Sequence, residues 1–144
     1  METQALLQTL LLYHEAFAEN DVARRLDLLS RSMTVDAQIW GPKRVFAGYE
    51  EISEKIEGFH KNWPGCRLAL TTGFNTFLNT AHFGAAIIGS DGETRAVGRS
   101  VIELASDGRI QRVLPLWEEL PPLPAGWPPH FAPSQQPSSK STKQ

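Results

Sequence analysis

Four strand-like segments follow one another from residue 66 to residue 120, separated only by short turns. They read CRLALTTGFNTF, NTAHFGAAIIG, ETRAVGRSVIELA and IQRVLPLWEEL. Asp107-Gly108, between the last two segments, is a dipeptide typical of a tight hairpin turn. Strands joined by tight turns pair antiparallel, so this half of the chain predicts a meander that forms one antiparallel sheet.

The half of the chain before Pro64-Gly65 shows helical spacing instead. The first helix, residues 4–18, carries apolar and aromatic side chains on one face, namely Leu6, Leu10, Tyr13 and Phe17. Asp21 can cap a second helix, residues 49–62 predict a third, and the short segment VDAQIWG between them resembles a strand. Helices first and strands after predict an α+β fold, with three N-terminal helices packed on one face of the antiparallel sheet.

The composition of the chain changes near residue 120. Residues 121–144 are rich in proline and hold no acidic residue, and the final stretch SQQPSSKSTKQ has nothing apolar to bury. We therefore expect a single folded domain, residues 1–120, followed by a Pro-rich and largely disordered tail, residues 121–144. Whether Trp127 and Phe131 of this tail lie on the domain is left open by the sequence.

The overall composition excludes several classes of partner. Hydrophobic residues make up 41% and charged residues 21% of the chain, which is ordinary for a soluble globular protein. A net charge of -2 argues against nucleic-acid binding, and no apolar run approaches the length of a membrane span. Cys66 is the only cysteine, so no internal disulfide can form, which fits a cytoplasmic protein.

Four pieces of the sequence, in this order, resemble the nuclear transport factor 2-like superfamily in its SnoaL-like branch. They are YHEAFAENDVARRLDLL, TVDAQIWGP, FAGYEEISEKIEGFHKNWPG and DGRIQRVLPLWEE, and the resemblance covers about residues 5–120. It implies a cone, in which a strongly curved sheet wraps around a pocket and the helices close one side. Most relatives pair as dimers through the outer face of the sheet.

Alternation along the last two strands assigns side chains to the inside of this cone. Resemblance to ketosteroid isomerases, which end on a similar motif, implies that the pocket is lined by Ser100, Ile102, Val113, Pro115 and Trp117. Leu114 and Leu116 then face outward, which is unusual for a monomer because apolar side chains would be left in water. We therefore expect a homodimer in which a second subunit covers them.

The same resemblance bears on the chemistry. Ketosteroid isomerases use a carboxylate base together with a tyrosine and a protonated aspartic acid. Tyr13 matches the tyrosine, but the base position falls at Gly41 and the aspartic acid position at Ser100. Glycine cannot accept a proton, so the match argues against that mechanism. The related epoxide hydrolases carry a carboxylate where this chain has Pro115.

Three residues remain as candidates for proton transfer or hydrogen bonding in the pocket, namely Tyr13, His82 and Ser100. Tyr13 either lines the pocket or is a core tyrosine bonded to the backbone. The face of His82 is open, because the preceding loop can be aligned in two registers and a one-residue slip reverses it. An inward His82 would be an acid–base group. Phe17 and Trp40 complete the expected walls.

Two classes of function are compatible with these residues. No group of His, Cys, Asp and Glu has metal-ligand spacing and no phosphate-binding loop is recognisable, so we expect neither a metal nor a cofactor. The chain either acts on a small, mostly apolar molecule as an isomerase, cyclase, dehydratase or hydrolase, or serves as a non-catalytic dimeric ligand-binding or scaffold module. A polar pair within hydrogen-bond reach inside the cavity would favour the enzyme.

Overall fold

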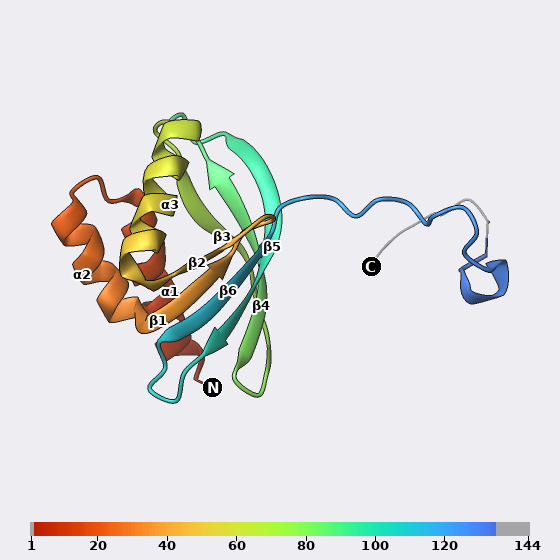
Figure 1. Cartoon of the computed structure of the whole chain (residues 1–144), viewed down its shortest axis with the longest axis horizontal. Coiled ribbons are helices and arrows are strands. Elements are labelled where there is room, and N and C mark those ends of the chain that lie inside the picture. Colours follow the sequence, from red (N-terminus) through yellow and green to blue (C-terminus); the bar gives the residue numbers. More distant parts are fainter. Residues whose placement is uncertain (1, 135–144) are drawn as a thin grey trace.

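The computed structural model describes residues 2–134, which form three helices packed against one six-stranded sheet (Figure 1). The helices are α1 (Thr3–Ala18), α2 (Val22–Ser32) and α3 (Gly48–Asn62). The strands are β1 (Met33–Trp40), β2 (Val45–Ala47), β3 (Arg67–Phe77), β4 (Thr80–Ile88), β5 (Thr94–Leu104) and β6 (Ile110–Leu116). This arrangement confirms the predicted α+β fold.

The strands lie in the order β2-β1-β6-β5-β4-β3, so the meander from β3 to β6 pairs antiparallel as predicted. Two features differ from the prediction. The edge strand β2 was not expected, and β1 pairs with β6 in parallel. A parallel pair is possible there because a long stretch of chain, including α3, separates the two strands. Register shifts within the β3–β4, β4–β5 and β5–β6 pairs mark the irregularities that let a sheet bend.

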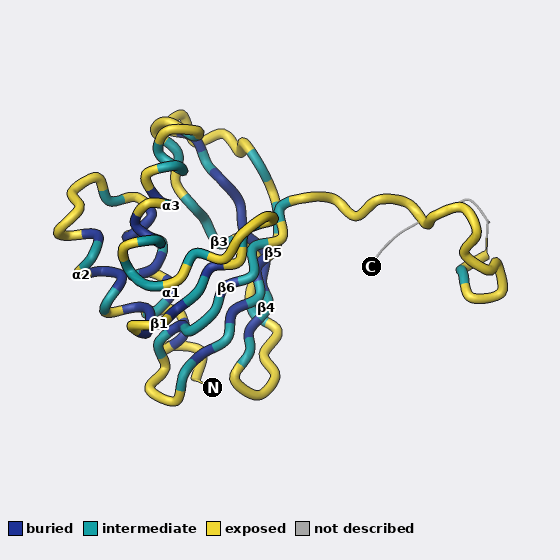
Figure 2. The backbone as a smooth tube through the Cα atoms, in the orientation of Figure 1, coloured by how far each residue is buried: buried dark blue, intermediate teal, exposed yellow. Residues whose placement is uncertain are grey.

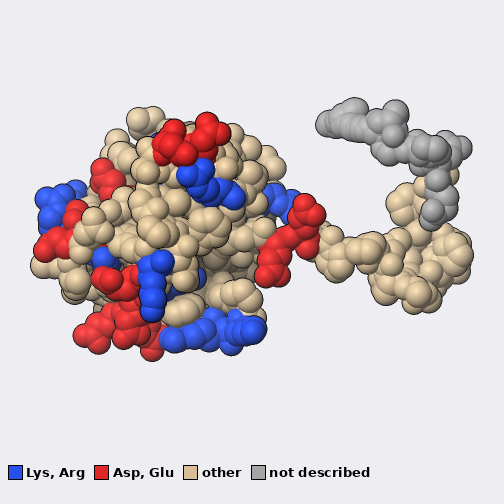
Figure 3. Space-filling view, turned by 90° about the horizontal axis from the view of Figure 1, so that it is seen from above, with Lys and Arg blue, Asp and Glu red and all other residues tan. Residues whose placement is uncertain are grey.

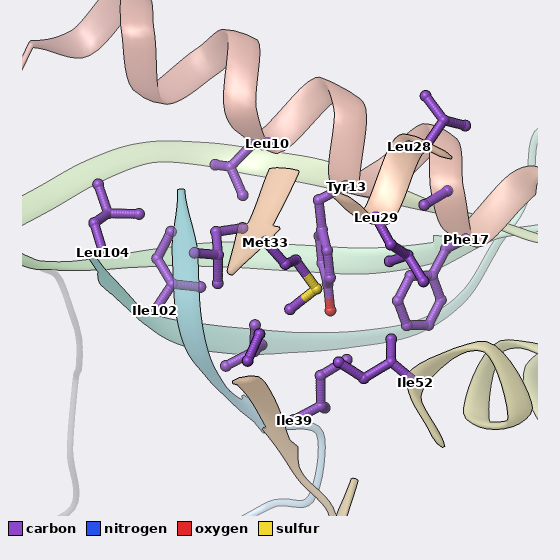
Figure 4. Close-up of a cluster of buried hydrophobic side chains, with 14 of the residues drawn as sticks. Leu10, Tyr13, Phe17, Leu28, Leu29, Met33, Ile39, Ile52, Ile102 and Leu104 are labelled. Carbon is purple, nitrogen blue, oxygen red and sulfur yellow. The ribbon is translucent and has the colours of Figure 1, made fainter. Parts of the chain in front are cut away.

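The core lies between the helices and the concave face of this sheet (Figure 2). The concave face is defined by its buried side chains, which include Ile39, Ala81, Phe83, Ile102 and Val113. The helices contribute Leu6, Leu10, Tyr13, Phe17, Leu29, Ile52 and Ile56 to the same cluster (Figure 4). The helical spacing and the strand alternation seen in the sequence thus bury one common set of residues.

A buried arginine joins the three helices. Arg25 of α2 is 0% exposed, and its guanidinium donates to the Glu19 carbonyl at 2.9 Å, to Ser53 Oγ at 3.0 Å and to Glu57 Oε2 at 2.8 Å. The predicted cap of α2 is present as well, because the Asp21 carboxylate accepts a hydrogen bond from the Arg24 backbone N–H. The end of α1, the start of α2 and the middle of α3 are therefore fixed to one another by charged and polar groups.

After β6 the described chain continues as an extended arm, residues 117–134, which runs away from the domain and ends in a 3₁₀ turn at Pro129–Phe131 (Figure 1). The boundary at residue 120 stays a prediction, and residues 135–144 of the expected tail lie outside the described residues. Among residues 2–134, the helices are too short or too polar to cross a lipid bilayer.

Candidate functional site

The register of the β5–β6 hairpin brings the expected pocket residues to one face. Ser100 lies opposite Pro115, and Ile102 lies opposite Val113. Ile102 and Val113 are almost fully buried in the core cluster, and Ser100 is 8% exposed. Four of the predicted pocket residues therefore share the concave face.

Tyr13 reaches the same core from α1 and is only 6% exposed (Figure 4). Its ring lies 5.1 Å from the Phe17 ring, so both aromatic residues occupy the helix side of the interior, as predicted. Burial raises the pKa of the Tyr13 hydroxyl well above its usual value. The group therefore stays protonated at neutral pH, where it can donate a hydrogen bond but cannot act as a base.

The hydroxyls of Tyr13 and Ser100 share an unusual property: within residues 2–134 neither has a hydrogen-bond partner. Within residues 2–134, Arg112 Nε is the one side-chain polar atom that has neither contact with solvent nor a hydrogen-bond partner. The two hydroxyl oxygens consequently still touch space that a water molecule can enter. The concave face thus offers two polar groups that are free to bond to something else.

Trp117 follows β6 and closes over Gly98 of β5. A Cβ atom at Gly98 would lie 2.6 Å from the Trp117 ring and 2.7 Å from the Leu116 carbonyl oxygen, so only glycine leaves room for the indole. Arg99 lies opposite Leu116, so the next positions along the two strands, Gly98 and Trp117, also lie opposite each other. Strand alternation puts them on the same face as Ser100 and Pro115. The half-buried indole lies at the end of the concave face.

Trp40 is not part of this site, and its prediction as a pocket wall is wrong. Its neighbour Ile39 is fully buried and pairs with Val113, so strand alternation turns Trp40 to the outer face. There it is 42% exposed, its Nε1 donates to Gln38 Oε1 at 2.8 Å, and the Arg112 guanidinium lies 5.2 Å from its ring centre.

His82 also lies on the outer face. Its neighbours Ala81 and Phe83 are buried in the core, and it pairs with Val101 of β5 and Asn75 of β3. It lines a hollow of about 490 Å³ together with Arg99 and Thr72. The structure therefore separates His82 from Tyr13 and Ser100 by the thickness of the sheet, and a shared catalytic role for the three residues is wrong.

Two further polar side chains near the core, His60 and Asp36, have structural partners. His60 Nε2 lies 2.6 Å from the Phe17 carbonyl oxygen, and Asp36 accepts a hydrogen bond from Thr34 Oγ1. His14 differs, since it is half-buried beside Tyr13, with 5.9 Å between the ring centres, and burial lowers its pKa to about 4. This burial is not visible in the sequence, because His14 sits at the flank of the apolar stripe of α1.

The interior is more tightly filled than the predicted closed cavity. Met33, Ile39, Ile52 and Ile102, drawn with Tyr13 in Figure 4, are fully buried. A second hollow, of about 320 Å³, lies between the start of α1 and the turns around Asn79 and Ser106, away from the two hydroxyls. Within the described residues no cluster of His, Cys, Asp and Glu could hold a metal ion.

Comparison with protein-family models and with curated proteins finds no match. Solved structures do match. A proposed isomerase of the SnoaL-like family from Agrobacterium tumefaciens is 26% identical with a TM-score of 0.71, and the match covers 81% of this chain and 99% of that one. An NTF2-like protein of unknown function from Exiguobacterium is 16% identical with a TM-score of 0.61, covering 78% of this chain and 99% of that one.

A third match is a proposed SnoaL-like polyketide cyclase from Jannaschia, 14% identical with a TM-score of 0.62, which covers 79% of this chain and 85% of the other. The matches agree with the element order, the curved sheet and the three helices described above. The chain therefore has the nuclear transport factor 2-like fold in its SnoaL-like form.

Proposed function

We propose that the concave face of the sheet binds a small, mostly apolar organic molecule, and that Tyr13 and Ser100 supply its hydrogen bonds. One observation carries this proposal: both residues are more than nine-tenths buried, and their hydroxyls have no partner within residues 2–134. A buried polar group without a partner costs about 1–3 kcal/mol, so such a pair is tolerated best where a ligand or water completes its bonding.

The surroundings of the two hydroxyls set the character of the ligand. The nearby side chains of the concave face are apolar or aromatic, among them Phe17, Ile102, Val113 and Trp117. Apolar walls with a few polar groups are typical of small-molecule sites. A ring-containing carbonyl compound fits, because its oxygen accepts from the protonated Tyr13 hydroxyl. Proposed isomerases and polyketide cyclases among the matching structures agree with a small organic ligand.

The same positions favour binding over acid–base turnover. The inward residues of β4 are Ala81, Phe83, Ala85 and Ile87, and those of β5 are Gly98, Ser100, Ile102 and Leu104. On β6 and after it, Val113, Pro115 and Trp117 follow. None of these side chains can accept a proton at neutral pH, and the Tyr13 hydroxyl is held in its protonated form. These strands therefore support holding and polarising a ligand, and the neutral His14 imidazole beside Tyr13 is a weak base, because burial lowers its pKa to about 4.

The test uses 1-indanone as an apolar ring ketone, with affinity measured by calorimetric titration. Tyr13→Phe keeps the ring and removes the hydroxyl, so affinity should fall by the worth of one hydrogen bond, about 0.5–1.5 kcal/mol or roughly 2- to 12-fold. Tyr49→Phe is the matched control, because the Tyr49 hydroxyl already donates to the Met33 carbonyl oxygen. Equal affinities of the native protein and Tyr13→Phe would refute the role of Tyr13.

A homodimer through the outer sheet face is part of this proposal. Trp40, Leu114 and Leu116 lie on that face beside the Arg112–Glu103 ion pair, and Leu116 is 44% exposed. An apolar strip with paired charges beside it is typical of a protein interface.

A cytoplasmic location, suggested by the lone Cys66, stays a prediction.

A further inference from the structure

The described arm, residues 117–134, exposes its apolar side chains to solvent. Leu120 is 84% exposed and Phe131 is 70% exposed, and Leu123 and Trp127 are at least half exposed. Figure 2 shows the arm running clear of the domain and exposed along nearly all of its length. Large apolar side chains gathered on one exposed segment mark a surface that binds something.

The end of the arm is organised by its own hydrogen bonds. The Trp127 backbone N–H donates to the Pro124 carbonyl at 3.2 Å, and Trp127 Nε1 donates to the Phe131 carbonyl at 2.9 Å. Gly126 takes a φ of +98°, which allows the turn between them. We call residues 124–132 the Trp127 knob. A knob that is ordered in advance loses little conformational entropy on docking.

A receiving site of suitable shape lies on the outer face of the sheet. The His82 groove, the hollow of about 490 Å³, is lined by Thr72, Gly73, Phe74, Asn75, His82, Phe83, Gly84 and Arg99. It follows the register shift of β3, where Thr72 Oγ1 accepts from the Gly84 N–H at 2.7 Å. A Cβ atom at Gly73 would meet nothing within 4 Å, so the groove is open above this residue.

A cation at the groove favours an aromatic occupant such as Trp127 or Phe131 of the knob. Arg99 at the groove is exposed and has no carboxylate partner within residues 2–134. Figure 3 shows acidic side chains where the arm leaves the domain, and the acidic residues of the described arm, Glu118 and Glu119, lie at this root and outside the knob. A free guanidinium is also the cation that stacks most often on indole and phenyl rings.

We propose that the Trp127 knob of one copy docks into the His82 groove of a second copy. The length of the spacer favours another molecule over the same one. Leu116 pairs with Arg99, and Arg99 pairs with Gly84, so the groove lies two strands from the root of the arm, or about 10 Å. The proline-rich spacer from Trp117 to Gly126 extends for roughly 28 Å at the ~3.1 Å rise of polyproline II.

A stiff spacer of that length places the Trp127 knob beyond the His82 groove of the same chain. The docking also leaves the outer strip on β1 and β6 free, because the groove lies over β3 and β4 and reaches β5 only at Arg99. Arm exchange and the proposed sheet dimer are therefore compatible, and either can fail without the other.

Disulfide trapping between two copies tests the exchange. In a Cys66→Ser background, one preparation carries Asn75→Cys at the groove and the other carries Ala125→Cys on the arm. The two preparations are mixed and oxidised at micromolar concentration. The disulfide between the two introduced cysteines should form at least about tenfold faster than the disulfide formed when Lys43→Cys replaces Asn75→Cys, because docking raises the effective concentration of one thiol near the other. Lys43 is exposed next to β2, at the opposite edge of the sheet from the groove.

Three further variants, one of them a control, show whether the trapping depends on the groove and the knob. Gly73→Val, at the open position, should fill the groove and reduce the rate to that of the Lys43 control, as should Trp127→Ala. Gly58→Ala, at an equally open glycine on α3, should leave the rate unchanged. Equal rates for the Asn75 and Lys43 pairs would overturn the proposal. So would a chain carrying both Asn75→Cys and Ala125→Cys that closes its own disulfide at a rate independent of concentration.

Discussion

The two tyrosines of the chain show how burial alone fails to define a role. Tyr49 donates to the Met33 carbonyl oxygen at 2.9 Å and thereby ties α3 to β1. Tyr13 is more deeply buried, yet its hydroxyl has no partner within residues 2–134. The first hydroxyl serves the fold, and we propose that the second serves a ligand.

This contrast predicts opposite effects of the same substitution on stability. Tyr49→Phe removes a made hydrogen bond and should lower the free energy of unfolding by about 0.5–1.5 kcal/mol. Tyr13→Phe removes an unpartnered hydroxyl and should leave the free energy of unfolding unchanged or slightly raised. Urea denaturation of both variants without ligand measures the difference. A loss of more than about 1 kcal/mol in Tyr13→Phe would mean that its hydroxyl bonds within the protein.

His14 should make the fold sensitive to mild acid. Burial lowers its pKa from 6.5 to about 4, so between these pH values the unfolded chain binds a proton that the folded chain does not. Stability should therefore be intact above pH 6.5 and decline as the pH falls towards 4, by at most roughly 3 kcal/mol. Denaturation from pH 7 to 4 should show a weaker decline in His14→Gln. Parallel curves for the two proteins would contradict this account of His14.

At the scale of elements, Arg25 holds the helical layer together. One guanidinium bonds to the end of α1, to Ser53 and to Glu57 of α3. Lysine offers a single ammonium group and cannot reproduce this fork of donors. The arrangement of the helices over the concave face thus depends on one buried charge whose bonds are all satisfied by named partners.

Arg25→Ala should therefore be among the more damaging substitutions in the helical layer, with a loss of several kcal/mol of unfolding free energy. Arg25→Lys should lose less, because it keeps the charge near Glu57. Arg24→Ala is the neighbouring control, since the Arg24–Glu19 pair lies at the surface and such pairs contribute little. Thermal melts of the three variants give the order, and an Arg25→Ala melt equal to that of Arg24→Ala would contradict the assignment.

The sequence predicted the elements better than their faces. Helical spacing located Tyr13 and Phe17 in the core, and the Asp107-Gly108 turn fixed the register that places Ser100 and Val113 together. The faces of Trp40 and His82 depend on single-residue shifts. A strand side chain changes sides when the register moves by one position; the β1–β6 pairing shifts between Met33 and Gln38, and the register of β4, which carries His82, depends on the turn that joins it to β3.

Long-range pairing was the other limit. The parallel contact of β1 with β6 leaves no local pattern, because the residues that pair are about seventy positions apart, as Ile39 and Val113 are. The unpartnered hydroxyls of Tyr13 and Ser100 are equally invisible in a sequence. Residue type shows that a hydroxyl is present, but only the surrounding atoms show whether it is already bonded.

On the scale of the whole molecule, the outer sheet face is the surface proposed for the dimer. Leu116→Asp places a carboxylate in the middle of the apolar strip, where burial without a partner is costly. Sedimentation at micromolar concentration should show a dimer for the native protein and a shift towards the 16.0 kDa monomer for Leu116→Asp. Val22→Asp, at an exposed position on α2, should remain dimeric. A native protein that sediments only as the monomer would refute the dimer.

The claim that the concave face is a binding site is tested most directly by a crystal structure with bound 1-indanone. We expect the ketone between α1 and the β5–β6 hairpin, with its oxygen at a hydrogen-bonding distance of about 2.5–3.0 Å from the Tyr13 hydroxyl oxygen. A ketone found only in the His82 groove or in the hollow near Asn79, with Tyr13 unchanged, would contradict the account.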